Sequence, residues 1–301
     1  MLNRSERQSQ KMLQETIVKN QNSSNMLKCQ FSARHYYNLA ENYNVAAFIG
    51  SLISLSFLLI PDKAYVAYSP IFLLTPSVFD IASLVCYKLM GISISRAALL
   101  RNYFDEIVLR AKISNNTESD IRKINSLIIN VVDKSKEECE LQISHTGRDN
   151  PPGVKNWYEF SKQYADSDVI FECQRQNRWW NNELSHRRIF LYGSVVILVI
   201  ISGILLVFFS NFSILRVFVC LLSAAITFTD RFIENLKYIR LSMKIDDRCE
   251  ALEVSKNKAL VSSLQELIAK RRELKIVEIN HIHKKHSKEL SERYEQITKD
   301  F

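Results

Sequence analysis

The feature that most constrains this chain is a run of 27 uncharged residues, from Ile189 to Leu215. At about 1.5 Å per helical residue, the roughly 20 residues up to Phe209 are enough to cross a bilayer core of roughly 30 Å. A second apolar run, Val217 to Thr229, follows almost at once and is separated from the first by Arg216. The sequence therefore predicts a transmembrane helical hairpin in this region.

Two more apolar blocks lie nearer the N-terminus. Residues Asn42 to Pro61 carry no charge, and Ala64 to Tyr87 could return across the bilayer but contain Pro70, Pro76 and Asp80. A proline inside a span removes a helical hydrogen bond and usually bends the helix, so we expect this second block to be the least regular of the four. The predicted fold class is all-α, an integral membrane protein with four transmembrane helices in two hairpins.

Basic residues indicate the orientation of these spans. The loops on one side offer only Lys63 and Arg216, whereas the segments on the other side carry Lys88, Arg96, Arg101, Arg178, Arg187, Arg188, Arg231, Lys237 and Arg240. By the positive-inside rule, both termini and the central region face the cytoplasm.

This topology divides the chain into five segments, and helical spacing of apolar residues continues in the polar ones. The tail suits a helical hairpin or coiled coil. The predicted segments are cytoplasmic N-terminal helices (1–42), transmembrane hairpin 1 (43–88), a cytoplasmic helical region (89–187), transmembrane hairpin 2 (188–230) and a C-terminal cytoplasmic helical tail (231–301).

Charge and motifs exclude several classes of function. The net charge of +8 comes from Lys and Arg beside the apolar blocks, so membrane lipid explains it and neither DNA nor RNA is expected as a partner. The six cysteines form no close pair and no N-terminal signal sequence is expected, which favours reduced thiols over zinc sites or disulfides. The sequence contains no phosphate-cradling glycine loop, HExxH motif or nucleophile elbow, so we do not expect an enzyme.

Histidines near the C-terminus are the nearest approach to a metal site. His281, His283 and His286 do not share one face of a helix, and neighbouring lysines are typical of a solvated surface. We therefore expect no metal and no resident cofactor.

Asp80 is the polar residue that stands out inside a predicted span. A carboxylate in a membrane is costly and often marks an ion path or a partner, so Asp80 is a candidate pore or intramembrane polar residue. It also lies near the cytoplasmic boundary, where it could reach water or cap a broken helix, and both interpretations stay open.

The most unusual polar stretch is CQRQNRWWNNELSHR, from Cys173 to Arg187. Arg175, Asn177 and Trp180 are of the types that contact phosphate and base in a nucleotide. Trp and Arg just outside a transmembrane helix are also typical of an interfacial anchor, and chemistry alone favours that alternative.

Several elements together resemble the SMODS-associating four-transmembrane effector family (S-4TM). Their order along almost the whole chain matches the family, and they are ERQSQKML, QFSARHYYNLAE, LLRNYFDEIVL, NWYEFS, CQRQNRWWNNELSHR and LQELIAKRR. The chain departs from the family at Gln8-Ser9, Ala40-Glu41 and Trp180-Asn181. The matching positions are Asp105, Trp157, Tyr158, Cys173, Gln174, Arg175, Asn177 and Trp180.

The resemblance implies a bacterial antiviral effector of CBASS-type abortive infection, in the inner membrane and functionally linked to a nucleotide cyclase. It implies that a cyclic nucleotide is the activating ligand and that the protein then permeabilises the membrane. Four helices of one protomer leave little room for a channel, so a pore would require a homo-oligomer. The alternatives are a ligand-independent membrane scaffold that recruits a partner through its cytoplasmic helices and, less favoured, a membrane-bound enzyme.

We hypothesise a ligand-sensing surface on the cytoplasmic side, with Asp105 as its structural partner. Its proposed ligand-binding residues are Trp157, Tyr158, Gln174, Arg175, Asn177 and Trp180. If one helix runs from Asp166 through Arg188 into the span, contacts on its cytoplasmic half would tilt its membrane half.

Overall fold

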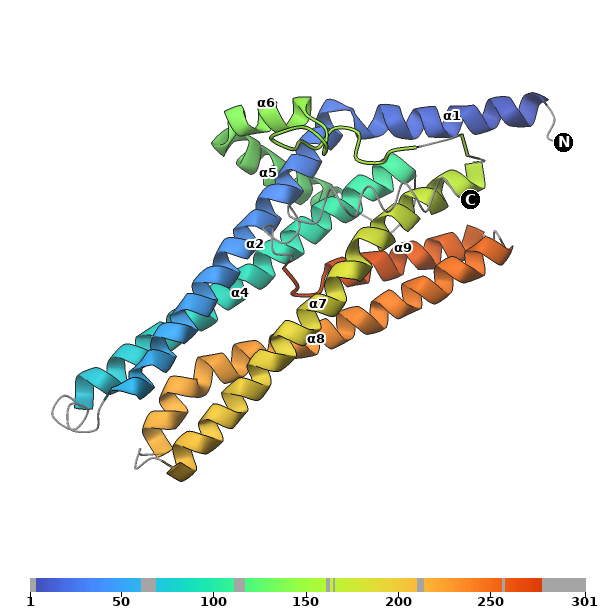
Figure 1. The fold of residues 1–301 in the computed structure, drawn as a ribbon. Helices are drawn as coiled ribbons and strands as arrows, with labels where there is room; N and C mark the ends of the chain where they lie inside the picture. The colour runs from blue at the N-terminus through green and yellow to red at the C-terminus, as the bar shows by residue number, and fades with distance from the viewer. Residues whose placement is uncertain are drawn as a thin grey trace.

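The computed structural model describes residues 4–60, 69–110, 117–160, 163–164, 166–209, 214–255 and 258–277. Every named element within these ranges is a helix, as Figure 1 shows. The β-pairing in the same ranges is one isolated bridge between Thr146 and Lys155. The all-α prediction is confirmed for this part of the chain.

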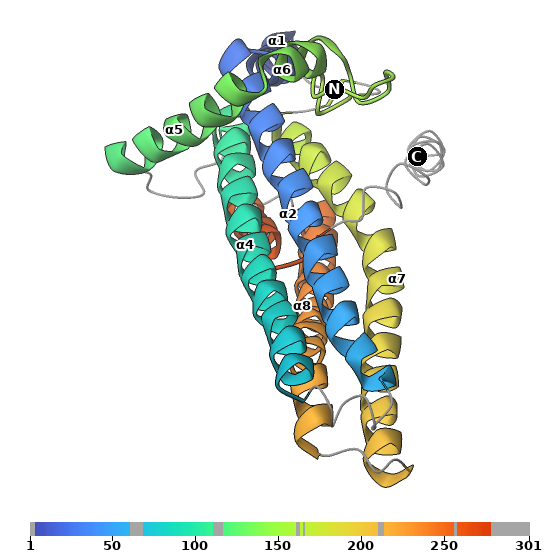
Figure 2. The same cartoon turned by 90° about the vertical axis from the view of Figure 1, so that its left-hand side faces the viewer.

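Four long helices form two hairpins that lie side by side (Figures 1 and 2). The first hairpin pairs α2 (Ser24–Ser56, continued by the 3₁₀ turn η1, Phe57–Leu59) with α4 (Ser69–Leu109). The second pairs α7 (Asp166–Phe209) with α8 (Ile214–Ser255). The helices contain 33 to 44 residues, or about 50–66 Å at about 1.5 Å per residue, which is roughly twice a bilayer core. Each can therefore have one half in lipid and one half in water.

The halves of the four long helices that lie remote from α1 (Arg4–Gln21) expose many large apolar side chains. Soluble monomers rarely expose large contiguous apolar patches, so this apolar belt indicates contact with lipid or with another protein. The exposed belt residues are Val45, Phe48, Ile49 and Leu52 on α2, Ile71, Leu74, Val78, Ile81 and Val85 on α4, Ile197, Leu198, Ile200, Ile201, Ile204 and Leu205 on α7, and Phe218 and Ile226 on α8.

Among the described residues, the helical stretch Pro70–Leu109 is long and apolar enough to cross a membrane, and Gly193–Leu205 forms a shorter apolar stretch. In the described part of the second block, residues 69–87, the expected irregularity is not found, because α4 runs unbroken through Pro76. Pro70 lies in the first turn, where its missing N–H is not needed, and Pro76 removes only one internal hydrogen bond.

Small residues bring α2 and α4 close together inside the belt. The Ser51 and Ser83 hydroxyl oxygens are 2.9 Å apart, and the Ser83 hydroxyl donates to the Ala47 carbonyl at 2.6 Å. A Cβ at Gly50 would lie 3.2 Å from the Ser83 Cβ. Such close approach is how helices associate where lipid removes the hydrophobic drive for packing.

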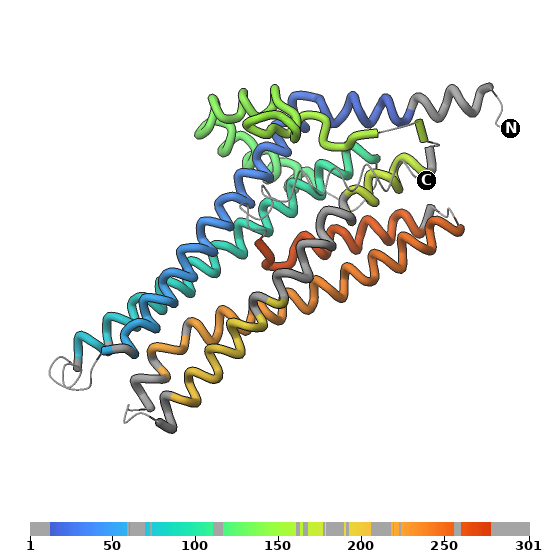
Figure 3. Tube along the Cα trace, in the orientation of Figure 1, coloured from blue at the N-terminus to red at the C-terminus, as the bar shows by residue number. Residues whose placement is uncertain are grey.

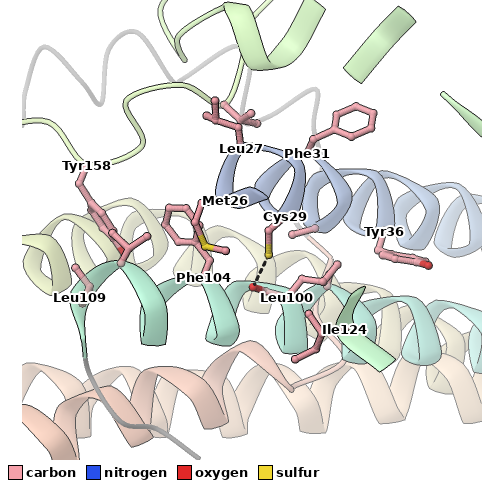
Figure 4. Close-up of a cluster of buried hydrophobic side chains, with 14 of the residues drawn as sticks. Met26, Leu27, Cys29, Phe31, Tyr36, Leu100, Phe104, Leu109, Ile124 and Tyr158 are labelled. Atoms are coloured by element: carbon pink, nitrogen blue, oxygen red, sulfur yellow. Dashed lines mark hydrogen bonds between the residues drawn. The ribbon is translucent and has the colours of Figure 1, made fainter. Parts of the chain in front are cut away.

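The end of the molecule opposite the apolar belt holds the largest apolar core of the described chain, drawn in Figure 4. It packs α2 and α4 against α1 (Arg4–Gln21), α5 (Glu118–Lys134) and α6 (Lys136–Ser144). The Cys29 thiol donates to the Leu100 carbonyl at 3.3 Å within this core.

The C-terminal part folds back on itself, as the trace in Figure 3 shows. Helix α9 (Lys258–Arg272) packs along α8, burying Leu264 and Ile268 against Ile245, Cys249 and Leu252. This is the predicted helical hairpin of the tail, and α7 is one continuous helix, also as predicted.

Candidate ligand-sensing site

A buried carboxylate, Asp105 on α4, is the centre of the half opposite the apolar belt. The Tyr158 hydroxyl donates to its Oδ1 at 2.6 Å. Its Oδ2 accepts from the Gln265 amide at 3.1 Å and pairs with the Arg272 guanidinium at 2.8 Å. Both carboxylate oxygens are therefore engaged, and Asp105 is only 1% exposed.

The same network reaches the second hairpin through α7. The Gln174 side-chain amide on α7 donates to the side-chain oxygen of Gln265. Arg272 also donates to the side-chain oxygen of Asn102 on α4 at 3.1 Å. We call the set Asn102, Asp105, Tyr158, Gln174, Gln265 and Arg272 the Asp105 cluster. It joins α4, α7, α9 and the segment around Tyr158, and a buried network of this kind is stable only when each member is satisfied.

The segment that carries Tyr158 is fixed to the N-terminal helix. The Tyr158 backbone N–H donates to the Gln21 side-chain oxygen at 2.8 Å, and the Gln21 side-chain amide donates to the Tyr158 backbone carbonyl at 3.1 Å. Two residues earlier, Asn156 has a φ of 54° and exchanges hydrogen bonds with Asn22. Asn is among the residues that adopt this left-handed conformation most readily.

Burial and charge set the protonation of the Asp105 cluster. Burial, followed by the negative charge of Asp105, raises the pKa of the Tyr158 hydroxyl well above its ordinary value, so it stays a neutral donor. Burial opposes the charge of Arg272, yet Asp105 and Tyr158 hold its pKa above the usual range. Arg272 therefore stays a cation at neutral pH beside the Asp105 side chain.

The predicted ligand-binding residues divide into separate groups. Tyr158 and Gln174 lie together with Asp105 in the cluster. Arg175 instead pairs with Glu172, one turn earlier on α7, at 2.9 Å. The side chains of Asn177 and Trp180 lie outside the described part of the structure.

Trp157 occupies a different position, beneath a basic residue of α4. The guanidinium carbon of Arg101 lies 3.8 Å from the centre of a Trp157 ring, and Trp157 remains 38% exposed. An arginine in this geometry has a cation–π contact with the indole. The structure thus pairs Trp157 with Arg101, one turn before Asp105, and not with Arg175.

Sequence reasoning missed three members of this region, Arg101, Gln265 and Arg272. Arg101 was counted only as a basic residue for orientation. Gln265 and Arg272 lie in LQELIAKRR, which served only as a family marker. The sequence signal that could have pointed to them was Asp105, an acidic residue on an apolar helix face. A carboxylate buried at such a position requires cationic or amide partners from other parts of the chain.

A second polar cluster lies nearer the apolar belt. The Tyr87 hydroxyl on α4 donates to Asp230 on α8 at 2.5 Å, and the Lys275 ammonium lies 3.6 Å from the same carboxylate. The Lys275 N–H donates to Glu234 at 3.2 Å, and Arg231 donates to Asn44 on α2 at 2.8 Å. We call Asn44, Tyr87, Asp230, Arg231, Glu234 and Lys275 the Asp230 cluster. It places the segment that follows α9 between the two hairpins.

Asp80 is buried on α4 within the apolar belt, 4% exposed, one turn before Ser83. Its role in a pore stays a prediction. Within the described ranges, no three His, Cys, Asp or Glu residues are arranged to hold a metal ion. His281, His283 and His286 lie outside those ranges.

A comparison with protein families finds a match to the SMODS-associating 4TM effector domain over residues 15–299. The chain belongs to this family. It is therefore a membrane effector of the type associated with CBASS defence, with a functional link to a nucleotide cyclase. Comparisons with curated proteins and with solved structures found no match.

Proposed function

We propose that this effector crosses the bacterial inner membrane with four helices, keeps both termini in the cytoplasm and permeabilises the membrane when a cyclic nucleotide binds. The protomers assemble into a homo-oligomer to form the conducting state. The conformational change is a population shift, which requires the ligand to bind the assembled state more tightly than the closed one.

The observation that carries this proposal is the division of each long helix into two halves. At one end the four helices expose the apolar belt, and at the other α4 and α7 bury charged and amide groups in the Asp105 cluster. Only lipid or a partner protein would cover the belt, whereas the polar half requires water around it.

Continuity of α7 supports the coupling between the two halves. This helix runs from Asp166 to Phe209 without interruption, so Gln174 and the exposed Ile204 belong to one rigid element. A change at the cytoplasmic end would move the membrane end directly. The ligand surface of this proposal includes Arg175, Asn177, Trp157 and Trp180.

Dye leakage from liposomes tests the proposal. The full chain is reconstituted into vesicles loaded with a self-quenched dye, and cyclic mono-, di- and trinucleotides are added one at a time. We expect leakage with one nucleotide and none without it. Leakage that no nucleotide changes would overturn the ligand response, and intact vesicles under every condition would favour the scaffold alternative.

Topology is tested separately by cysteine labelling. All six native cysteines are free, and five of them are buried. New cysteines at residues 62 and 212 should react with a membrane-impermeant maleimide from outside the cell, while one at residue 130 should react only after permeabilisation. Labelling of residues 62 and 130 from the same side would exclude the four-span topology.

A further inference from the structure

Arg101 differs from three other arginines of the cytoplasmic half in what engages it. Arg34 donates to the Pro152 carbonyl, Arg178 pairs with Asp246, and Arg272 pairs with Asp105. Among the described residues, Arg101 has no hydrogen bond and no ion pair, and its direct contact is the face of Trp157. Arg101 is half-buried, and burial lowers its pKa to about 10, so it stays a cation whose N–H donors can bind a ligand that reaches it.

The charges around Arg101 leave a positive surplus. Arg101 lies one helical turn from Asp105, the carboxylate whose two oxygens already accept from Tyr158, Gln265 and Arg272. Two guanidinium groups thus share one carboxylate, and both remain protonated at neutral pH. A bound anion is what would balance the second guanidinium.

We infer that Arg101 and Trp157 form the anchor of a ligand site, in which Arg101 binds a phosphate and the exposed indole of Trp157 stacks on a base. This inference rests on the proposed function and names residues that contact its ligand. The fork of a guanidinium matches two phosphate oxygens, and an indole stacks on any base. The ligand class is a nucleotide phosphodiester.

The position of the site connects it to the rest of the molecule. Trp157 is followed by Tyr158, which donates to Asp105, and Gln265 links Asp105 to Gln174 on α7. A phosphate on Arg101 adds negative charge beside Arg272 and competes with Asp105 for it. The ligand would therefore weaken the contact between α4 and α9 and act on α7 through Gln265.

Direct binding to the full chain in detergent micelles tests this inference by calorimetric titration. The probes are inorganic pyrophosphate, which has no base, and a panel of cyclic mono-, di- and trinucleotides. Arg101→Gln should weaken binding of pyrophosphate and of the active nucleotide at least tenfold, and Arg101→Lys should weaken it less. Trp157→Ala should weaken binding of the active nucleotide at least fivefold and change the affinity for pyrophosphate by less than twofold.

Arg96→Gln is the matched control. Arg96 is also on α4 and also stacks on an aromatic ring, that of Tyr36 at 5.6 Å, but it is exposed and remote from Asp105. The Arg96→Gln variant should bind both probes with affinities within twofold of those of the unmodified protein. Thermal unfolding of each variant checks that it is folded, and Arg101→Lys provides the comparison if Arg101→Gln is not.

The outcomes separate the site from the function. Unchanged binding in both Arg101 variants, an equal loss in Arg96→Gln, or no binding of any probe by the unmodified chain would overturn the site. Nucleotide-dependent leakage that persists in Arg101→Gln would also overturn the site while the proposed function stands. Arg101-dependent binding without any leakage from liposomes would instead support the site and refute the function.

Discussion

The two polar clusters both include α4, but they differ in their partners and in their exposure to solvent. The Asp105 cluster joins α4 to α7 and α9, and the Asp230 cluster joins α4 to α2 and α8. The Asp105 cluster is sealed, with Asp105 and Gln265 each 1% exposed. In the Asp230 cluster, the side chains of Asp230 and Lys275 are 35% and 49% exposed. Ion pairs in a dry interior are costly to break because a lone buried charge remains, whereas exposed pairs are screened and contribute little. The sealed cluster should therefore determine the fold of the half opposite the apolar belt, and the contacts of the open cluster should be easier to change.

The largest effect is expected from Asp105→Ala. Removing this carboxylate leaves Arg272 buried without a counter-charge, and breaking a buried pair in this way costs about 3–5 kcal/mol. Denaturant unfolding in micelles should show this loss of stability as a lower midpoint concentration of denaturant. Glu118→Ala is the control, since Glu118 pairs with Arg122 on the exposed surface of α5 and should change stability by less than about 0.5 kcal/mol. Equal effects of the two changes would contradict the comparison.

Tyr158→Phe should have the next largest effect. It removes the hydroxyl that donates to Asp105 and keeps the ring packed near Phe104, so about 1–3 kcal/mol should be lost. The same unfolding measurement applies. Tyr103→Phe on α4 is the matched control, because the Tyr103 hydroxyl makes no hydrogen bond within the described chain. If Tyr158→Phe left the free energy of unfolding unchanged, Asp105 would not need this donor.

Alkaline pH should weaken the sealed cluster selectively. The pKa of Tyr158 is raised by burial and by Asp105, so in the unfolded chain the phenol ionises first, near pH 10. Stability is therefore full below about pH 10 and falls as pH rises towards the folded pKa, by up to about 1.4 kcal/mol per unit. Unfolding curves from neutral to alkaline pH should show a shallower fall in Tyr158→Phe than in the unmodified protein. Identical slopes would remove Tyr158 as the cause.

The smallest effect is expected in the open cluster. Lys275→Ala removes a 3.6 Å pair with Asp230 but keeps the backbone bond to Glu234, so about 1 kcal/mol or less should be lost. The loss should diminish in high salt, which screens exposed charges. Lys270→Ala, on the exposed face of α9, is the control. A salt-independent loss as large as that of Asp105→Ala would show that the two clusters do not differ.

Much of the long-helix architecture could be predicted because it depends on local pattern. The region from Asp166 to Phe209 contains no proline, and its apolar residues begin where its charges end, so one continuous helix was expected and is found. The prediction for α4 was wrong at Pro76 because the rule for proline describes a local cost, which the packing of a 41-residue helix overcomes. The five-segment division and the ligand role of Arg175 stay predictions.

The candidate site could be predicted only in part. Trp157, Tyr158, Gln174 and Asp105 were named from the family motif, but the motif does not say which of them meet. Tyr158 and Gln174 are buried with Asp105, whereas Trp157 meets Arg101. Their separation in the chain, 53 residues between Asp105 and Tyr158 and 160 between Asp105 and Gln265, leaves no periodicity from which to infer contact.

The sequence by itself determined that this chain is helical, that it carries long apolar stretches beside basic segments, and that it belongs with the S-4TM effectors. The first two properties follow from composition and spacing along the chain, which act over a few helical turns. The family follows from the order of its motifs along the chain and from the match over residues 15–299. The tertiary structure alone decided that one buried carboxylate would be contacted by a tyrosine from the segment before α7 and by a glutamine and an arginine from α9. A buried charge is tolerated only where enough partners converge on it, and convergence is a property of the fold.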